Sequence, residues 1–216
     1  MGKRRRSRRS VSWLLFKFDR PYLQRYGLIA GVDEAGRGPL AGPVVAAAVI
    51  LPPNSRIPYL NDSKQLTAEK RLTLYQQIHQ SAQAIGVGIV EHDEIDRLNI
   101  YHASFAAMRQ ALDRLTVRPR HVLVDGYRIP RGPESQTGVI GGDAKSACIA
   151  AASIIAKVTR DRLMKALDRH YPGYGFKQHK GYGTPAHLDS LRALGPCPIH
   201  RRTFAPVRRS LAGVSR

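Results

Sequence analysis

Two adjacent acidic residues, Asp33 and Glu34, end an apolar run and are followed by the turn Gly36-Arg37-Gly38. Carboxylate oxygens are the ligands that magnesium and manganese prefer. Glycines let backbone amides come close to a phosphate, and an arginine side chain can pair with it. The stretch therefore combines a candidate metal site with a candidate phosphate site, and we call residues 36–38 the Gly-Arg-Gly turn.

Two further acids have a similar setting. Asp125 follows the apolar run 121–124, and Asp143 follows Gly141-Gly142 ahead of a long helical pattern. Carboxylates that converge from separate segments repel one another unless cations neutralise them, and two divalent ions can activate a water against a phosphodiester. Each acid also has a simpler interpretation, because Asp143 could cap the following helix and Asp125 could open a turn.

The charge of the chain indicates its class of partner. The 216 residues carry a formal net charge of +19, and the six lysines and arginines between residues 3 and 9 leave +13 on the remainder. Basic surfaces bind nucleic acid by neutralising phosphates and releasing counterions. A non-catalytic nucleic-acid-binding protein would show the same excess, so charge alone leaves the activity open.

Composition excludes several other classes. The two cysteines, Cys148 and Cys197, are far apart and lack zinc-ligand spacing, which argues against a disulfide framework and a structural zinc site. No run approaches the roughly 20 apolar residues that span a bilayer, and the N-terminus lacks a secretory pattern. We expect a cytoplasmic protein without membrane contact.

Periodicity predicts an α/β domain with a mixed sheet. The expected strands are 28–32, 44–51, 84–90 and 121–124, and the expected helices start near Thr67 or cover 93–115, 145–167 and 185–193. Leu72, Tyr75 and Ile78 are placed on one face of the first helix. The alanines of the 145–167 helix predict close contact with the sheet. Residues 1–26 form a basic tail and lead-in, of which 1–10 are expected to be disordered; 27–170 form the main domain, and 171–216 a small helical extension packed on it.

Several long motifs in one order resemble the ribonuclease HII family, the type 2 ribonucleases H. They are Val32 to Pro43, Asp62-Ser63-Lys64-Gln65-Leu66, Val124-Asp125-Gly126, Gly142 to Ser146, Ala151 to Asp161 and Lys180-Gly181-Tyr182-Gly183-Thr184. The resemblance spans about residues 27–207. It implies the ribonuclease H-like fold, with a five-stranded mixed sheet flanked by helices. The related type 3 enzymes share the acids, but the Gly-Arg-Gly turn and residues 180–184 favour type 2.

The resemblance further implies a reaction. Asp33, Glu34, Asp125 and Asp143 would be the catalytic acids and would bind one or two Mg²⁺ or Mn²⁺ ions. The substrates would be RNA/DNA hybrids and duplex DNA with embedded ribonucleotides, cut on the 5′ side of a ribonucleotide to leave 5′-phosphate and 3′-hydroxyl ends. This implies a monomeric endonuclease in ribonucleotide excision repair.

The resemblance also implies substrate contacts. Gly36, Arg37 and Gly38 would contact the backbone around the 2′-hydroxyl, and Tyr182 would stack on the next deoxynucleotide sugar. Further nucleic-acid contacts are expected from Lys64, Lys145, Ser146 and Lys180. Lys64, Lys145 and Ser146 have ordinary structural interpretations as well, as does Lys157 on the same helix. Asp161 is expected to form a helix-surface ion pair, and His179, His187 and His200 are expected at the surface or on phosphate rather than on metal.

Overall fold

A computed structural model describes the backbone of residues 8–213 and the side chains of residues 12–212. Its centre is a five-stranded mixed sheet in the order β3-β2-β1-β4-β5. The strands are β1 (Ile29–Ala35), β2 (Val44–Ile50), β3 (Ala84–Val90), β4 (His121–Asp125) and β5 (Gln136–Val139). β1, β2 and β3 pair antiparallel, whereas β4 runs parallel to both β1 and β5. The predicted mixed α/β sheet is confirmed.

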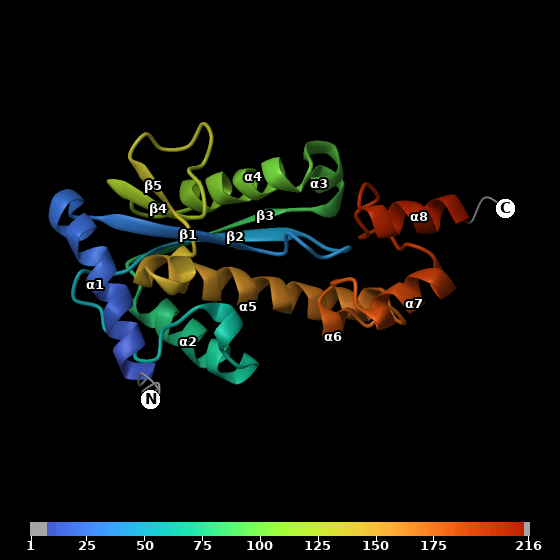
Figure 1. Cartoon of the computed structure of the whole chain (residues 1–216), viewed down its shortest axis with the longest axis horizontal. Coiled ribbons are helices and arrows are strands. Elements are labelled where there is room, and N and C mark those ends of the chain that lie inside the picture. The colour runs from blue at the N-terminus through green and yellow to red at the C-terminus, as the bar shows by residue number, and fades with distance from the viewer. Residues whose placement is uncertain (1–7, 214–216) are drawn as a thin grey trace, which may run out of the picture.

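Helices cover both faces of the sheet (Figure 1). They are α1 (Arg8–Tyr26), α2 (Ala68–Ser81), α3 (His92–Leu98), α4 (Ile100–Asp113), α5 (Ala147–His170), α6 (Phe176–His179), α7 (Pro185–Leu194) and α8 (Ala205–Gly213), with 3-10 turns η1 (Ser63–Gln65) and η2 (Gly142–Ala144). The helices α1, α2 and α5 lie on one face, and α3 and α4 on the other. α6, α7 and α8 lie beyond one end of the sheet.

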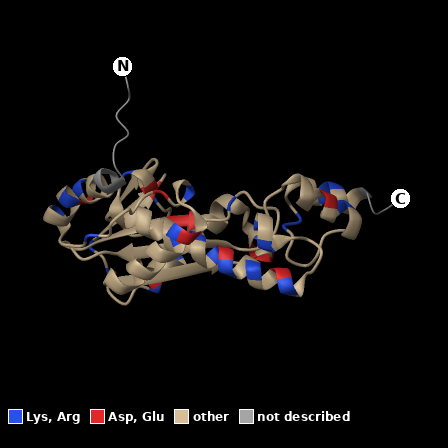
Figure 2. Ribbon diagram, turned by 90° about the horizontal axis from the view of Figure 1, so that it is seen from below, with Lys and Arg blue, Asp and Glu red and all other residues tan. Residues whose placement is uncertain are grey.

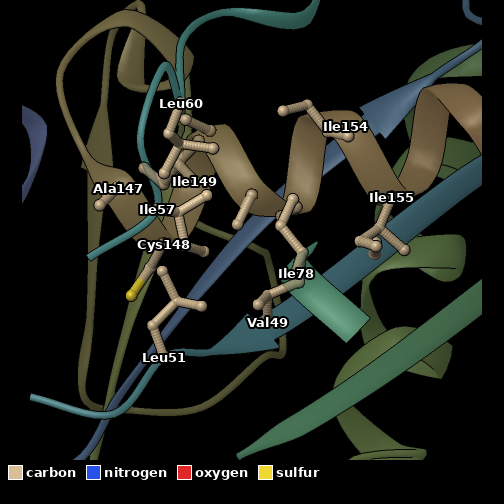
Figure 3. Packing of buried hydrophobic residues seen from close by; sticks show 14 of the residues in the cluster. Val49, Leu51, Ile57, Leu60, Ile78, Ala147, Cys148, Ile149, Ile154 and Ile155 are labelled. Carbon is tan, nitrogen blue, oxygen red and sulfur yellow. The ribbon is translucent and has the colours of Figure 1, made fainter. Parts of the chain in front are cut away.

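The long helix α5 sits directly on β1 and β2. A Cβ atom added to Gly31 would lie 2.1 Å from the backbone of Cys148, so only glycine permits this contact. Ile149, Ile154 and Ile155 are fully buried against the sheet and α2 (Figure 3). This packing confirms the close approach that the alanines of α5 predict.

On the opposite face of the sheet, glycines again allow a helix to pack closely on a strand. Cβ atoms added to Gly86 and Gly88 of β3 would lie 1.9 Å from the carbonyl oxygens of Ala111 and Ala107 on α4. The two glycines therefore let α4 approach β3 closely, and the strand is held between α4 and its partner β2.

The N-terminal lead-in is helix α1, so the expected disorder is wrong from Arg8 onward; residues 1–7 lie outside the described residues. Leu15 is buried in the main core. The buried Asp19 accepts a hydrogen bond from the Cys148 amide at 2.9 Å and so caps the start of α5. Ser12 donates to the Ile57 carbonyl at 2.7 Å. These contacts make α1 part of the folded body.

Several elements differ from the sequence prediction. The helix expected over 93–115 is two helices, because Asn99 has a φ of 64° and caps α4 through its side chain. On α2 the buried side chains are Leu74 and Ile78, whereas Leu72 is exposed, so the predicted face is wrong at Leu72. The short elements β5, α6 and α8 lie in segments for which no element was predicted.

The residues after α5 form a compact C-terminal substructure against the distal half of that helix. Its core contains Met164 of α5 and Ala41 of the loop after β1, together with Tyr174, Phe176, Cys197 and Ile199. Asp96 of α3 accepts hydrogen bonds from the amides of Arg202 and Thr203 at 2.7 and 3.0 Å. The substructure is thus tied to both helical layers, while its boundary at residue 171 stays a prediction.

Candidate active site

Three acids meet at the ends of adjacent parallel strands. Asp33 lies near the end of β1, Asp125 is the last residue of β4, and Asp143 lies in η2 just after β5. Because Val32 pairs with Val124 in the parallel ladder, the residues that follow them emerge side by side. One carboxylate oxygen from each of the three acids lies within 4.8 Å of the others. We call this group the acid site.

Short contacts fix each carboxylate of the acid site. Asp33 accepts a hydrogen bond from the Glu34 amide at 2.7 Å, and Asp125 accepts one from the Gly142 amide at 2.6 Å. The Nζ of Lys64 donates to Asp143 Oδ2 at 3.0 Å. All three carboxylates are therefore oriented before any ligand binds.

Among the side chains that the structure describes, the three carboxylates of the acid site share one cationic partner, Lys64, so negative charge remains in excess. Burial, followed by repulsion from Glu34 and Asp125, holds the pKa of Asp33 well above its usual range. Burial raises the pKa of Asp125 as well, and Asp143 adds to the effect. Hard oxygen donors under mutual repulsion are the donor set that a divalent cation stabilises, so these residues fit Mg²⁺ or Mn²⁺.

Glu34 occupies the other side of β1. Consecutive strand residues point to opposite faces, so Glu34 does not join the three oxygens of the acid site. The guanidinium of Arg37 lies 3.3 Å from Glu34 Oε1. Burial raises the pKa of Glu34, and the charge of Arg37 opposes the rise. Glu34 therefore links the acid site to the Gly-Arg-Gly turn.

The Gly-Arg-Gly turn lies beside the loop that carries Tyr182. Gly36 has a φ of +99°, and a Cβ atom there would lie 2.1 Å from Nε of Arg160. A Cβ atom on Gly38 would lie 3.7 Å from Cε1 of Tyr182, whose side chain is 43% exposed. The Leu40 amide donates to the Gly181 carbonyl at 2.7 Å. The fold thus brings together the turn and the tyrosine.

The remaining predicted contacts divide into three cases. Lys64 reaches the acid site with a side chain that is 76% exposed. Lys145 and Lys180 donate to the carbonyls of Ile140 and Lys177, with Lys145 exposed to solvent. Ser146 is fully buried and its hydroxyl accepts from the Ile149 amide at the start of α5, so the structure gives it a capping role, and its contact with nucleic acid stays a prediction.

Two other predictions concern α5 and the histidines. Asp161 pairs with Lys157 at 2.7 Å on the helix surface, as expected. His187 and His200 are fully buried, which corrects their expected surface position. Their Nε2 atoms lie 3.1 Å apart, and His187 Nδ1 lies 2.9 Å from the Tyr182 carbonyl. The histidines therefore support the loop that carries Tyr182.

Sequence reasoning missed two buried arginines near the turn. Arg160 donates to the carbonyls of Pro43, Lys180 and Ala41, and Arg201 donates to those of Gly42, Arg37 and Gly36. Arg160 lies four residues from both Ala156 and Met164 on the buried face of α5, so periodicity could have identified it. Arg201 lies in an irregular segment that offers no such signal.

Known proteins resemble this chain over most of its length. The sequence profile of the family described as Ribonuclease HII matches residues 30–207. The Ribonuclease HII of Geobacillus kaustophilus is 52% identical over 96% of this chain and 88% of its own length. That of Maricaulis maris is 59% identical over 85% of this chain and 84% of its own length.

Solved structures agree with the sequence relatives. The ribonuclease H2 of Pyrococcus horikoshii OT3 aligns with a TM-score of 0.71 and 29% identity, covering 86% of this chain and 98% of that one. A ribonuclease HIII solved in complex with Mn²⁺ aligns at 0.65 and 20% identity, covering 87% of this chain and 70% of that one, which shows the common ribonuclease H-like fold. The chain belongs to the ribonuclease HII family and is an endoribonuclease.

Proposed function

We propose that this ribonuclease H hydrolyses the RNA strand of RNA/DNA hybrids and nicks duplex DNA on the 5′ side of single embedded ribonucleotides, leaving 5′-phosphate and 3′-hydroxyl ends. The observation that carries the proposal is the convergence of Asp33, Asp125 and Asp143 within 4.8 Å, one residue from Glu34 and the adjoining turn. A cutting site and a site for recognising the sugar would then be contiguous.

The metal ligands in this proposal are Asp33, Asp125 and Asp143, with Glu34 as a fourth acid that lies close enough to Asp125 for the two charges to repel. A bound Mg²⁺ or Mn²⁺ ion would supply an activated water and stabilise the charge on the departing oxygen. The protein's own part is to hold the acids: the Gly142 and Glu34 amides fix two carboxylates, and Lys64 holds the third. Lys64 could then move from Asp143 to a substrate phosphate.

Recognition of the ribonucleotide is assigned to the Gly-Arg-Gly turn and Tyr182. Exposed backbone amides can bond to a 2′-hydroxyl, which alone distinguishes RNA from DNA at one position. The exposed ring of Tyr182 beside Gly38 would press on the next sugar, where a 2′-hydroxyl would crowd it. This pairing favours a junction with RNA on one side and DNA on the other.

Lysines and arginines also occur beyond this site. Figure 2 shows Lys and Arg segments in both the sheet-bearing part and the C-terminal substructure. Among the described residues, no helix has the length and apolar character needed to cross a membrane. We propose Lys145 and Lys180 as phosphate contacts, together with a monomeric state and a cytoplasmic location. Affinity should fall steeply with salt, because phosphate contacts release counterions.

A duplex with one embedded ribonucleotide tests the proposal. With Mg²⁺ or Mn²⁺ we expect one nick 5′ to the ribonucleotide, and no product with a chelator present. The Asp33→Asn variant should bind the duplex but fail to nick it. An undiminished nick in that variant, or activity on hybrids without activity on the single ribonucleotide, would contradict the corresponding part of the proposal.

Tyr182→Ala tests the junction preference separately. We expect a five- to tenfold loss of cleavage at an RNA-DNA junction, about the value of one aromatic contact, with a smaller change on a continuous RNA/DNA hybrid. Steady-state kcat/KM on both substrates measures the ratio, and Tyr182→Phe is the matched control because it keeps the ring. Equal losses on both substrates would remove the proposed role of the ring.

A further inference from the structure

Arg201 is a buried cation whose partners are backbone carbonyls. Its side chain is fully buried, and among residues 12–212 no ion pair to it is present. Its Nε donates to the Gly42 carbonyl at 3.0 Å, and its two terminal nitrogens donate to those of Arg37 and Gly36 at 2.9 and 2.6 Å. The guanidinium thus binds the inner side of the Gly-Arg-Gly turn.

These hydrogen bonds fix the direction of the adjoining amides. In a planar trans peptide the C=O of one residue and the N–H of the next point in opposite directions. With the Gly36 and Arg37 carbonyls directed at Arg201, the Arg37 and Gly38 N–H groups point away from it. Within the described part of the chain neither amide donates to a protein acceptor, and both residues are exposed.

We propose that Arg201 is a positioning residue that preorganises the Arg37 and Gly38 amides as donors to the 2′-hydroxyl and adjacent phosphate of the ribonucleotide. This rests on the proposed function of the turn. Successive outward N–H groups form a concave site for anions and lone pairs. A fixed guanidinium positive charge behind those peptides makes the donors stronger and removes the entropy of ordering them.

The planar fork of arginine is essential to this role. A guanidinium offers donors in one rigid plane, whereas a lysine ammonium is a compact group on a flexible stem. Lysine at position 201 would keep the positive charge but could not donate to the Gly36 and Arg37 carbonyls at the same time with the same geometry. Arg201→Lys therefore separates positioning from charge.

Arg160 provides a matched control. It is also buried, and it also donates to three carbonyls, at 2.8, 3.0 and 3.1 Å. Two of its carbonyls, those of Ala41 and Lys180, precede amides that are used inside the protein: Gly42 N–H donates to the Ile199 carbonyl and Gly181 N–H to His179. Arg160→Lys disturbs an equivalent set of bonds beside Gly36 and at the Tyr182 loop, while the carbonyls of Gly36 and Arg37 keep their donors from Arg201.

The first measurement is binding selectivity. In an Asp33→Asn background, which prevents cleavage, dissociation constants are measured for a duplex with one ribonucleotide and for the same duplex made entirely of DNA. The selectivity is the dissociation constant for the DNA duplex divided by that for the duplex with one ribonucleotide. We expect this selectivity to fall about tenfold in Arg201→Lys and less than twofold in Arg160→Lys, with affinity for the DNA duplex nearly unchanged. An unchanged ratio in Arg201→Lys, or equal falls in both variants, would overturn the proposal.

The second measurement does not depend on the substrate. Backbone ¹⁵N relaxation should show ordered Arg37 and Gly38 amides in the wild-type chain and in Arg160→Lys, and increased mobility in Arg201→Lys. Retained order in Arg201→Lys would contradict the positioning role. If the Asp33→Asn protein with Arg201 intact does not distinguish the two duplexes, the proposed function of the turn is contradicted. The relaxation measurement still decides whether Arg201 orders the turn.

Discussion

The acid site and the two carbonyl-bound arginines differ in how their buried charge is stabilised. At the acid site, carboxylates of like sign are gathered within 4.8 Å and the pKa values of Asp33 and Asp125 are raised. Around Arg160 and Arg201, each buried cation donates to three carbonyls. Burial lowers their pKa values to about 10 and about 9, so both remain charged at neutral pH.

The difference separates two tasks. The negative charge that remains at the acid site beyond its cationic partner, Lys64, makes the site receptive to a cation from solution, at a cost to the stability of the metal-free fold. Hydrogen-bonded charge makes the arginines part of the scaffold, and their removal would leave carbonyls without donors. We therefore expect activity and stability to respond oppositely to mutation in the two regions.

The largest expected effect comes from Asp33→Asn. Cleavage should fall at least about a thousandfold, equivalent to about 4 kcal/mol of transition-state stabilisation. Stability in chelator should be unchanged or higher, because the amide removes a buried charge and its Oδ1 still accepts from the Glu34 amide. Nicking rates and urea unfolding measure the two quantities. A marked loss of stability would show instead that Asp33 stabilises the fold.

Arg160→Met should show the reverse pattern of stability. Three carbonyls lose their donors, and at about 1 kcal/mol each the free energy of unfolding should fall by about 3 kcal/mol. Urea denaturation at pH 7 gives this value, and the exposed Arg162→Met on the same helix is the control. A change below about 0.5 kcal/mol would show that the arginine hydrogen bonds do not stabilise the fold.

The buried His200 predicts acid sensitivity. Burial, followed by the neighbouring His187, lowers the pKa of His200 from 6.5 to about 4. Between these values the unfolded chain binds a proton that the folded chain excludes, so stability is lost as pH falls below 6.5. The loss at pH 5 is about 2 kcal/mol.

Asp19 opposes this trend, because burial raises its pKa to about 6 and its protonation stabilises the fold as pH falls. The comparison of wild type with His200→Asn therefore isolates the histidine. The stability difference between the two proteins should change by about 2 kcal/mol in favour of the variant between pH 8 and pH 5. A difference independent of pH would contradict the depressed pKa.

The smallest effect is expected at Lys64. Its ammonium pairs with Asp143 from an exposed position, so Lys64→Gln should lower affinity for a hybrid only a fewfold. If the lysine contacts a phosphate, the slope of log affinity against log salt should also fall by about one. Titrations at several salt concentrations measure both, with Lys70→Gln on α2 as the control.

The parts that the sequence predicts well are those with strong local patterns. Apolar runs locate β1 to β4, and Asp33 and Asp125 are identified because each ends such a run before a glycine-bearing loop. The alanines of α5 predict its contact with the sheet. These features depend on residues close together in the chain, so periodicity and turn chemistry are sufficient.

Other features depend on partners distant in sequence. The burial of His187 and His200 follows from contacts among the C-terminal helices, and the role of Arg201 depends on carbonyls 159 to 165 residues away. The sequence alone leaves the structure of residues 11–26 open, because the contact that holds α1 in place joins Asp19 to the Cys148 amide, 129 residues away. Polarity alone predicts that these histidine and arginine side chains lie at the surface, whereas tertiary hydrogen bonds bury them.

The close contact of α5 with Gly31 has a consequence for how the two ends of that helix are held relative to each other. The absence of a side chain at Gly31 lets α5 pack directly on β1. The helix is about 36 Å long, with Asp143 just before its start and Arg160 about 20 Å along it. One inserted residue between them would turn the distal part by about 100° and shift it by about 1.5 Å. The insertion would therefore move Arg160 relative to Asp143, and with it the carbonyls of Ala41, Pro43 and Lys180 that Arg160 binds.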